Sequence, residues 1–431
     1  MEQSRYNVVI PYHNYLIIYN TLWNTIVYAQ NDNESIMNLT KKEKLPNNWD
    51  NIPSILLEKK IIVESTDLEI KHIRDLITQN MHNRKVLDIV VLPTLACNYK
   101  CWYCYENHKL KNSQIMSISE VEAITKYIYN SVNQNSEIEV VHIRFFGGEP
   151  FLYYNEVIKP LLENIKKISD ELGVLYMASA TTNGSLIKQE DINFLVNHRL
   201  NHLQITLDGN KERHNKVRFS RLGDNSYDTI VNNIKAVNRE GIKVSVRLNI
   251  SEETRLDVGK LLDDFLDVSH KELLTFSIHK VWQAKKEVIY TIDQIVNQIR
   301  KAGFYCVSYY SAPSSIWKTC YADKENEIVI KPGGYVYKCT ARDFTQERAE
   351  GRLMENGNIQ WNERYFKRSQ LSVLDNPECM KCAIMPICIG GCKQKIIEHG
   401  NNRTCIRNFT ESDKREYAQK VLFEKLERIT P

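Results

Sequence analysis

The sequence predicts an α/β protein organised around a partial (β/α)6 TIM-like barrel. Six apolar, strand-like runs alternate with helical stretches between residues 86 and 300, and seven cysteines lie from residue 320 onward, after this rhythm has stopped. Strands that alternate with helices form parallel sheets, and a series of six such units curls into a partial barrel. A chain of 431 residues is also too long for one small core. We expect three domains, which cover residues 1–85, 86–305 and 306–431.

Composition and charge indicate an ordinary cytoplasmic globular protein. The chain is 42% hydrophobic and 26% charged, and its formal net charge of +4 is small for its length. This charge argues neither for nor against nucleic acid, and we expect no nucleic-acid partner. We also expect no membrane, because no run reaches the roughly 18 apolar residues of a membrane span and the N-terminus does not read as a signal peptide. Eleven cysteines in a cytosolic chain favour metal or redox chemistry over disulfides.

The N-terminal segment predicts a small α+β module. Residues 7–29 hold two apolar runs around the polar pair His13-Asn14, which is typical of a hairpin. Residues 52–65 predict a helix that leads into a strand, and residues 67–80 predict a helix. At the other end of the chain, residues 361–370 predict a solvated surface and residues 413–429 an amphipathic helix.

The barrel segment repeats a strand and then a helix. Its predicted strands are residues 86–96, 139–148, 175–184, 202–209, 243–251 and 272–282, and two of its clearest helices are residues 153–173 and 227–241. In barrels of this kind, functional residues lie in the loops that follow the strands.

Three cysteines, Cys97, Cys101 and Cys104, come directly after the first predicted strand. A cubane iron-sulfur cluster takes four ligands, so a set of three leaves one iron open for another group. The spacing also fits a helix with buried cysteines, but Pro93 and the apolar run before the trio favour a strand that enters a loop. Zinc would need a fourth ligand, for which His108 is the local candidate.

A second motif, Gly147-Gly148-Glu149-Pro150, ends the second predicted strand. Glycines allow the backbone to approach a ligand closely, and a carboxylate beside them can hold an ammonium group. Taken alone, the motif is also typical of a simple turn.

The cysteine spacing C-x3-C-x2-C, with the aromatic Tyr103 before the last cysteine, resembles the radical S-adenosylmethionine (SAM) enzymes. The resemblance implies that SAM chelates the open iron through its amino and carboxylate groups and that a reduced 4Fe-4S cluster cleaves it to a deoxyadenosyl radical. It also implies that the Gly-Gly-Glu-Pro motif binds the SAM amino group. Residues 207–218 resemble the family's D-G-x4-H-x3-R, whose arginine reaches the SAM carboxylate; a surface arginine is the alternative. The further SAM-binding positions implied are Thr182, Asn183, Asp208, Arg218 and Asn249.

The C-terminal cysteines resemble the SPASM extension of radical SAM enzymes that act on peptides and proteins; a zinc ribbon is the alternative. The spacing C-x2-C-x5-C-x3-C is the core of this likeness. The family's ligation implies one auxiliary cluster on Cys379, Cys382, Cys388 and Cys405. It implies another on Cys320, Cys339 and Cys392, which brings the total to three 4Fe-4S clusters. The candidates for the fourth ligand of this second cluster are Cys306, a residue elsewhere and the substrate itself. Cys306 is alternatively a hydrogen-atom donor or a buried thiol.

The resemblance implies an oxygen-sensitive oxidoreductase, a radical SAM/SPASM maturase that installs a thioether or carbon-carbon crosslink in a ribosomal precursor peptide. The N-terminal module would be winged-helix-like and hold the leader peptide as an added strand; a lid packed on the barrel is the alternative. The expected partners are this peptide and an electron donor such as flavodoxin or ferredoxin. An anaerobic sulfatase-maturing enzyme, a peptide epimerase and a non-catalytic electron carrier remain alternatives, although about 96 residues precede the cluster motif, more than in the sulfatase-maturing enzymes.

Overall fold

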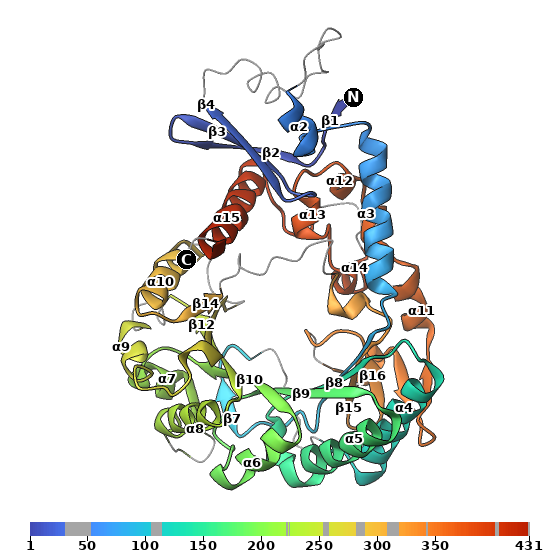
Figure 1. Cartoon of the computed structure of the whole chain (residues 1–431). Coiled ribbons are helices and arrows are strands. Elements are labelled where there is room, and N and C mark those ends of the chain that lie inside the picture. The colour runs from blue at the N-terminus through green and yellow to red at the C-terminus, as the bar shows by residue number, and fades with distance from the viewer. Residues whose placement is uncertain are drawn as a thin grey trace. The chain divides into compact units, whose positions relative to one another are not determined.

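The computed structural model of this chain forms two compact units (Figure 1). The terminal unit combines Met1–Asn83, Tyr310–Lys324 and Lys367–Pro431, and the barrel unit combines Arg84–Tyr309 and Glu325–Phe366. The structure describes residues 1–30, 53–104, 114–220, 223, 225–252, 258–281, 289–307, 319–341, 344–400 and 405–429.

The barrel unit contains all six predicted strands. They are β6 (Val86–Val91), β8 (Val140–Phe145), β9 (Leu175–Thr182), β10 (Leu200–Leu207), β12 (Lys243–Ile250) and β13 (Leu274–Lys280). Each strand pairs in parallel with the one before it, so their order in the sheet is their order along the chain. The prediction of a parallel, barrel-type α/β sheet is therefore confirmed.

Helices connect these strands. They include α4 (Ile118–Gln134), α5 (Lys159–Leu172), α6 (Gln189–Asn197), α7 (Lys211–Val217), α8 (Tyr227–Arg239), α9 (Val258–Asp263) and α10 (Ile289–Lys301). Local sequence sets their ends: Ser117 and Glu120 form a capping box at the start of α4, and Gly173 closes α5 in the left-handed region. The predicted helix over 153–173 begins instead with a 3-10 turn, η1 (Pro150–Tyr153), and a π-helical turn, η2 (Tyr154–Ile158), which lead into α5.

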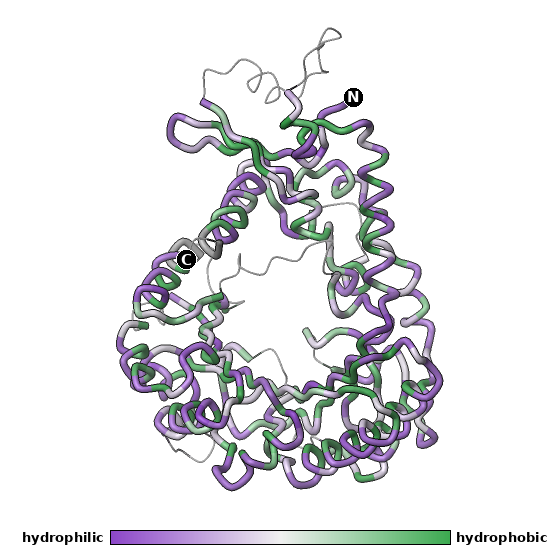
Figure 2. Tube along the Cα trace, viewed as in Figure 1, coloured by the Kyte–Doolittle hydropathy of each residue, from purple (hydrophilic) through white to green (hydrophobic). Residues whose placement is uncertain are grey.

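The two faces of the sheet differ in polarity. Leu87, Ile89 and Val91 alternate along β6 and join the main apolar core, which extends through every parallel strand. Figure 2 shows hydrophobic residues along these strands and hydrophilic ones on outer turns of the helices. The opposite face carries polar side chains that bond across strands: Arg144 Nε donates to Asp88 Oδ1 at 2.8 Å.

Five short strands extend this sheet beyond the prediction. They are β14 (Tyr305–Val307), β15 (Glu327–Lys331), β16 (Tyr335–Tyr337), β17 (Gly351–Leu353) and β18 (Ile359–Trp361). β14 pairs in parallel with β13, and β15 pairs in parallel with β6 at the other side. Residues 325–366 consequently belong to the barrel unit, whereas the sequence groups them with the C-terminal cysteines; the three-domain division stays a prediction. Strands this short show too few alternations to be recognised.

The terminal unit contains the predicted hairpin, the predicted helix and strand, and the predicted second helix, together with strands outside the prediction. Its N-terminal elements are β1 (Glu2–Gln3), β2 (Asn7–Tyr12), β3 (Tyr15–Asn20), β4 (Thr25–Gln30), α2 (Ser54–Glu58), β5 (Ile62–Val63) and α3 (Thr66–Met81). β2 and β3 form the hairpin around His13, which takes the positive φ of 51° that its tight turn requires. β4 adds a third antiparallel strand that the two-run prediction did not include.

The C-terminal part of the terminal unit is helical. It contains α12 (Pro377–Met380), α13 (Met385–Cys388), α14 (Lys393–His399) and α15 (Glu411–Ile429), preceded by α11 (Glu363–Gln370). The predicted C-terminal helix is confirmed as α15, and it packs on the hairpin: the Phe423 and Tyr12 rings lie 5.3 Å apart. Lys425 Nζ donates to Asn24 Oδ1 at 2.6 Å.

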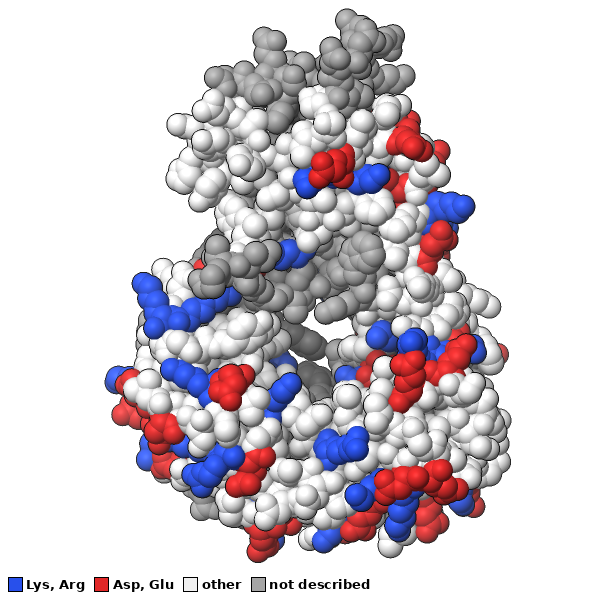
Figure 3. Space-filling model, viewed as in Figure 1, with Lys and Arg blue, Asp and Glu red and all other residues white. Residues whose placement is uncertain are grey.

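Within the described residues, no helix is long and apolar enough to cross a membrane. On the face shown in Figure 3, positive and negative side chains lie interspersed over the barrel unit.

Candidate functional site

The three cysteines of the first loop line one cavity of about 180 Å³ in the barrel unit. The chain leaves β6 at Val91 and forms the short strand β7 (Tyr99–Cys101), which pairs antiparallel with β11 (Arg218–Ser220). This pairing places Arg218 directly opposite Cys101. Predicted site residues that line the cavity are Cys97, Cys101, Tyr103, Cys104, Gly147, Gly148, Thr182, Asn183, Arg218 and Asn249.

The glycines after β8 are required by their contact with the cysteine loop. The Gly148 N–H donates to Thr94 O at 3.2 Å, and the Glu149 N–H donates to Ala96 O at 2.8 Å. A Cβ atom on Gly148 would lie 2.1 Å from Ala96 O, and Gly147 has a φ of 111°. The Gly-Gly-Glu-Pro turn is therefore hydrogen-bonded to the backbone that directly precedes the first of the three cysteines.

Glu149 lies behind the cavity wall, 0% exposed, with Pro150 buried beside it as the first residue of η1. Its Oε1 accepts from Thr182 Oγ1 at 2.6 Å and from the Phe151 N–H at 3.0 Å, and its Oε2 accepts from the Asn183 N–H at 2.7 Å. Burial raises the pKa of Glu149, and these donors oppose that rise. The carboxyl group thus fixes the end of β9, while its oxygens retain acceptor capacity.

The Tyr103 hydroxyl joins three predicted site residues. It donates to Asp208 Oδ2 at 2.5 Å and accepts from Arg218 Nη1 at 2.8 Å and from Asn249 Nδ2 at 3.1 Å. Burial raises the pKa of Asp208, and the Arg218 charge opposes this effect. Asp208 Oδ1 and Arg218 Nε are buried and have no hydrogen-bond partner among the described residues, so a bound ligand can satisfy both.

The histidine of the D-G-x4-H-x3-R segment supports the same network. His214 is 0% exposed, and its Nδ1 accepts from the Asp208 N–H at 3.3 Å. Burial lowers the pKa of His214 well below its usual value, so the ring is neutral and able to accept. This hydrogen bond holds the backbone of Asp208 in place, so the histidine of the motif is a positioning residue.

Replacement of Tyr103 by phenylalanine is expected to weaken SAM binding about tenfold, because three buried polar groups lose their shared partner. Iron content should be unchanged. The measurement is the KM for SAM in 5′-deoxyadenosine formation, together with kcat. Tyr129→Phe, which removes an exposed hydroxyl 3.1 Å from Glu171 Oε1 on the helical layer, is the matched control. An unaltered KM in Tyr103→Phe would contradict a positioning role for this hydroxyl.

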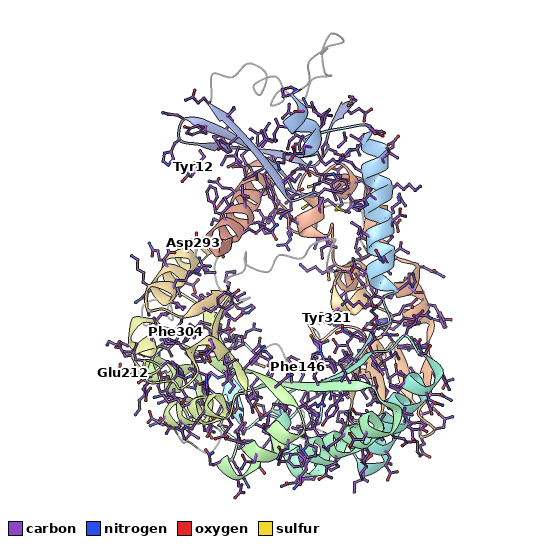
Figure 4. The ribbon with its side chains drawn as sticks, viewed as in Figure 1. Tyr12, Phe146, Glu212, Asp293, Phe304 and Tyr321 are labelled. Carbon is purple, nitrogen blue, oxygen red and sulfur yellow. The ribbon has the colours of Figure 1, made fainter. Side chains whose placement is uncertain are left out.

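Several lining residues were missed in the sequence. They are Tyr99, Phe146, Thr181, Gln204, Thr206, Arg247, Lys280 and Val281. Figure 4 labels Phe146, which directly follows β8. The available signal was period-two alternation: Gln204 and Thr206 on β10, and Arg247 and Asn249 on β12, lie on one face of the sheet. Arg247 Nε donates to Asn249 Oδ1 at 3.0 Å.

The donor set fits a cluster bound by three thiolates. Among the described residues, no three Cys, His, Asp or Glu side chains converge as a single metal ion requires. A cubane places each thiolate on a different iron, so it does not need that convergence. Burial raises the pKa of Cys97 to about 12, which keeps the thiol protonated until a metal replaces the proton. His108, the candidate zinc ligand, lies outside the described residues.

A second set of cysteines gathers in the terminal unit. Cys379 Sγ donates to Gly390 O at 2.7 Å, which brings the chain after α13 back onto α12. Burial and then the charges of Cys382 and Cys405 raise the pKa of Cys379 to about 11. Burial likewise raises the pKa of Cys388 to about 12, with Cys382, Cys379 and Cys405 adding to the rise. The four predicted ligands of one auxiliary cluster are thus close enough to influence one another.

Alanine at Cys388 is expected to remove about four iron atoms per chain, the content of one cubane. SAM cleavage with dithionite should remain, because the cysteines of the barrel unit are untouched. Iron analysis of anaerobically reconstituted protein measures this. Full iron content in Cys388→Ala would argue against a cluster at these four cysteines.

The remaining cysteines are placed differently. Cys320 and Cys392 belong to the terminal unit and Cys339 to the barrel unit, so their shared cluster stays a prediction. Cys306 lies on β14, opposite Phe276, in the main apolar core and 1% exposed. It is not among the residues that line the described cavity.

Comparison with known proteins agrees with this geometry. Residues 91–265 match the Radical SAM superfamily. A cysteine-type anaerobic sulfatase-maturating enzyme of Clostridium novyi is 24% identical over 371 residues, covering 77% of this chain and 94% of the relative. The radical SAM cyclopropyl synthase TigE of Paramaledivibacter caminithermalis is 24% identical over 338 residues, covering 72% and 67%.

Two solved structures have a similar fold. Native anSMEcpe with bound AdoMet superimposes with a TM-score of 0.61 at 19% identity, covering 80% of this chain and 98% of that one. Streptococcus suis SuiB superimposes with a TM-score of 0.53 at 16% identity, covering 94% and 99%.

Proposed function

This chain carries a radical SAM domain, and on that premise we propose that it is a maturase that modifies a ribosomally made precursor peptide. The observation that carries the proposal is the cavity that gathers Cys97, Cys101 and Cys104 against the Gly-Gly-Glu-Pro turn and the Tyr103 network. When bound, the cluster and SAM would supply the electron and the adenosyl radical that abstracts a hydrogen atom from the substrate.

The chain's own residues would hold and orient these groups. The three thiolates would hold the cluster and leave one of its irons without a protein ligand, free for SAM. Arg218, tied to Tyr103 and Asp208, would bind the SAM carboxylate. Asn183, fixed by Glu149, and Thr182 would contact the rest of the cofactor, as would the backbone of Gly147 and Gly148.

A peptide substrate is supported by the N-terminal sheet. Among the described strands, β4 pairs with β3 alone, so its outer edge presents backbone groups to which an extended leader peptide can add. SuiB, which shares this fold, has been solved bound to its precursor peptide SuiA. We infer the same class of partner here, with an intramolecular thioether or carbon-carbon crosslink as the product. The reducing cytoplasm is the compartment that suits such clusters.

Sulfatase maturation is the second candidate, because relatives with this activity align over nearly their full length. Epimerisation is weakened as an alternative, since the thiol donor it needs cannot be Cys306 in the apolar core.

Mass spectrometry of a peptide encoded beside the gene, co-expressed anaerobically with the protein, separates these reactions. A crosslink removes two hydrogens and leaves tandem spectra without fragments between the joined residues. An unchanged mass would favour epimerisation. Formylglycine in a co-expressed sulfatase, with an unmodified peptide, would overturn the proposal.

A further inference from the structure

The ribbon formed by β7 and β11 has one side toward the cavity and another toward solvent. Residues directly opposite each other in an antiparallel pair point to the same face, and successive residues alternate. Tyr99, Cys101 and Arg218 line the cavity, so the residues between them, Lys100 and Phe219, point away from it. The register places Phe219 directly opposite Lys100.

The outward side is exposed and aromatic. Phe219 is 48% exposed, and Trp102, the next residue after Cys101, is 58% exposed. Trp102 lies edge-on to Tyr103, with ring centroids 5.6 Å apart, so it is held beside the cysteine loop. Aromatic side chains of this kind are enriched at protein interfaces, and transient electron-transfer complexes need less than about 1,200 Å² of total buried area.

The ribbon itself carries positive charge. Residues 99–104 and 216–220 contain Lys100, Lys216 and Arg218 and no carboxylate, and Glu212 lies one turn before Lys216 on α7. Lys100 and Lys216 are exposed, whereas Arg218 is turned inward. A cationic, aromatic surface attracts a negatively charged partner.

We propose that the outward side of this ribbon, with Trp102, is the docking surface for an acidic protein that carries a one-electron cofactor. The inference rests on the proposed function, because a radical SAM cluster needs one electron from outside for each SAM cleaved. Lys100 and Trp102 flank Cys101, the proposed cluster ligand, in the chain, so a donor bound here would contact the outward side of the strand whose inward side carries that cysteine. In the transfer, the donor's cofactor loses one electron and the cluster gains it, and no bond or proton is exchanged.

The test compares two reductants for each variant. 5′-Deoxyadenosine formation is measured anaerobically with dithionite and, separately, with flavodoxin reduced by its NADPH-dependent reductase. Lys100→Glu and Phe219→Ser should each slow the flavodoxin-driven rate at least about fivefold and leave the dithionite-driven rate within about twofold. Both should also raise the Kd for oxidised flavodoxin, measured by isothermal titration calorimetry, at least about fivefold. Raising the ionic strength should reduce the difference between wild type and Lys100→Glu.

Matched controls lie elsewhere on the barrel unit. Lys167→Glu changes an exposed lysine of α5, and Leu175→Ser changes a 58% exposed residue at the amino end of β9. Neither should alter the rate with flavodoxin. Unchanged flavodoxin rates in both ribbon variants would overturn the docking surface, and so would equal losses with both reductants. Failure of the proposed function is distinguishable, since the wild-type protein would then form no 5′-deoxyadenosine even with dithionite.

Discussion

Alanine at Cys97, Cys101 or Cys104 should lower the rate of SAM cleavage by roughly 10³-fold or more, because no protein side chain can supply the electron that the cluster would provide. The three thiols line the same cavity and come from one short loop held by β7 and β11. Loss of any one leaves a cubane with two protein ligands. The measurement is dithionite-driven 5′-deoxyadenosine formation, normalised to iron content.

Cys306→Ala is the matched control for this series. Its side chain lies in the apolar core, so the change costs packing but removes no ligand of the cavity. We expect cleavage within about threefold of wild type. Comparable activity in the alanine variants at 97, 101 and 104 would contradict the assignment of the cluster to this loop.

Alanine at Gly148 is expected to reduce SAM cleavage about 100-fold, because overpacking against rigid backbone costs of order 1–3 kcal/mol and displaces the site. The added Cβ would meet Ala96 O at 2.1 Å and Leu95 O at 2.5 Å. These atoms are backbone and cannot rotate away, so the cysteine loop itself must shift. The resulting loss should appear in iron content as well as in turnover.

Gly241→Ala is the control for this substitution. Gly241 has a φ of 83°, but no atom lies within 4 Å of a Cβ built on it. It should cost about 1 kcal/mol of stability through left-handed strain and leave cleavage unchanged. If Gly148→Ala retained full iron and turnover, the close approach of the two motifs would not matter to function.

The parallel sheet could be predicted because each strand is a long apolar run bounded by turns and helices. β14 to β18 escaped notice because most have three residues, too few to show a period. The cysteine and Gly-Gly-Glu-Pro motifs were visible because local spacing encodes them. The sequence could not show that Glu149 fixes Thr182 and Asn183, since that contact joins segments more than 30 residues apart.

The hydrogen-bond network of Tyr103 could not be predicted from the sequence either. Tyr103, Asp208, Arg218 and Asn249 were each predicted as site residues, but the hydroxyl that joins them depends on the pairing of β7 with β11. Arg247 shares the polar phase of β12 with Ser245 and Asn249, so alternation could have identified it. Lys280 ends β13 in the phase of its apolar residues, so the pattern gave no signal for it.

The most direct test of the central claim is electron paramagnetic resonance of the anaerobically reconstituted, dithionite-reduced protein before and after addition of SAM. Alanine at Cys388 is expected to simplify the spectrum, because it would remove the proposed auxiliary cluster. A cluster with an open iron in the barrel cavity predicts a 4Fe-4S signal whose g values change when SAM binds, and predicts that this signal is absent from Cys101→Ala. Protein that contains zinc and no iron, or a signal that SAM leaves unaltered, would contradict it.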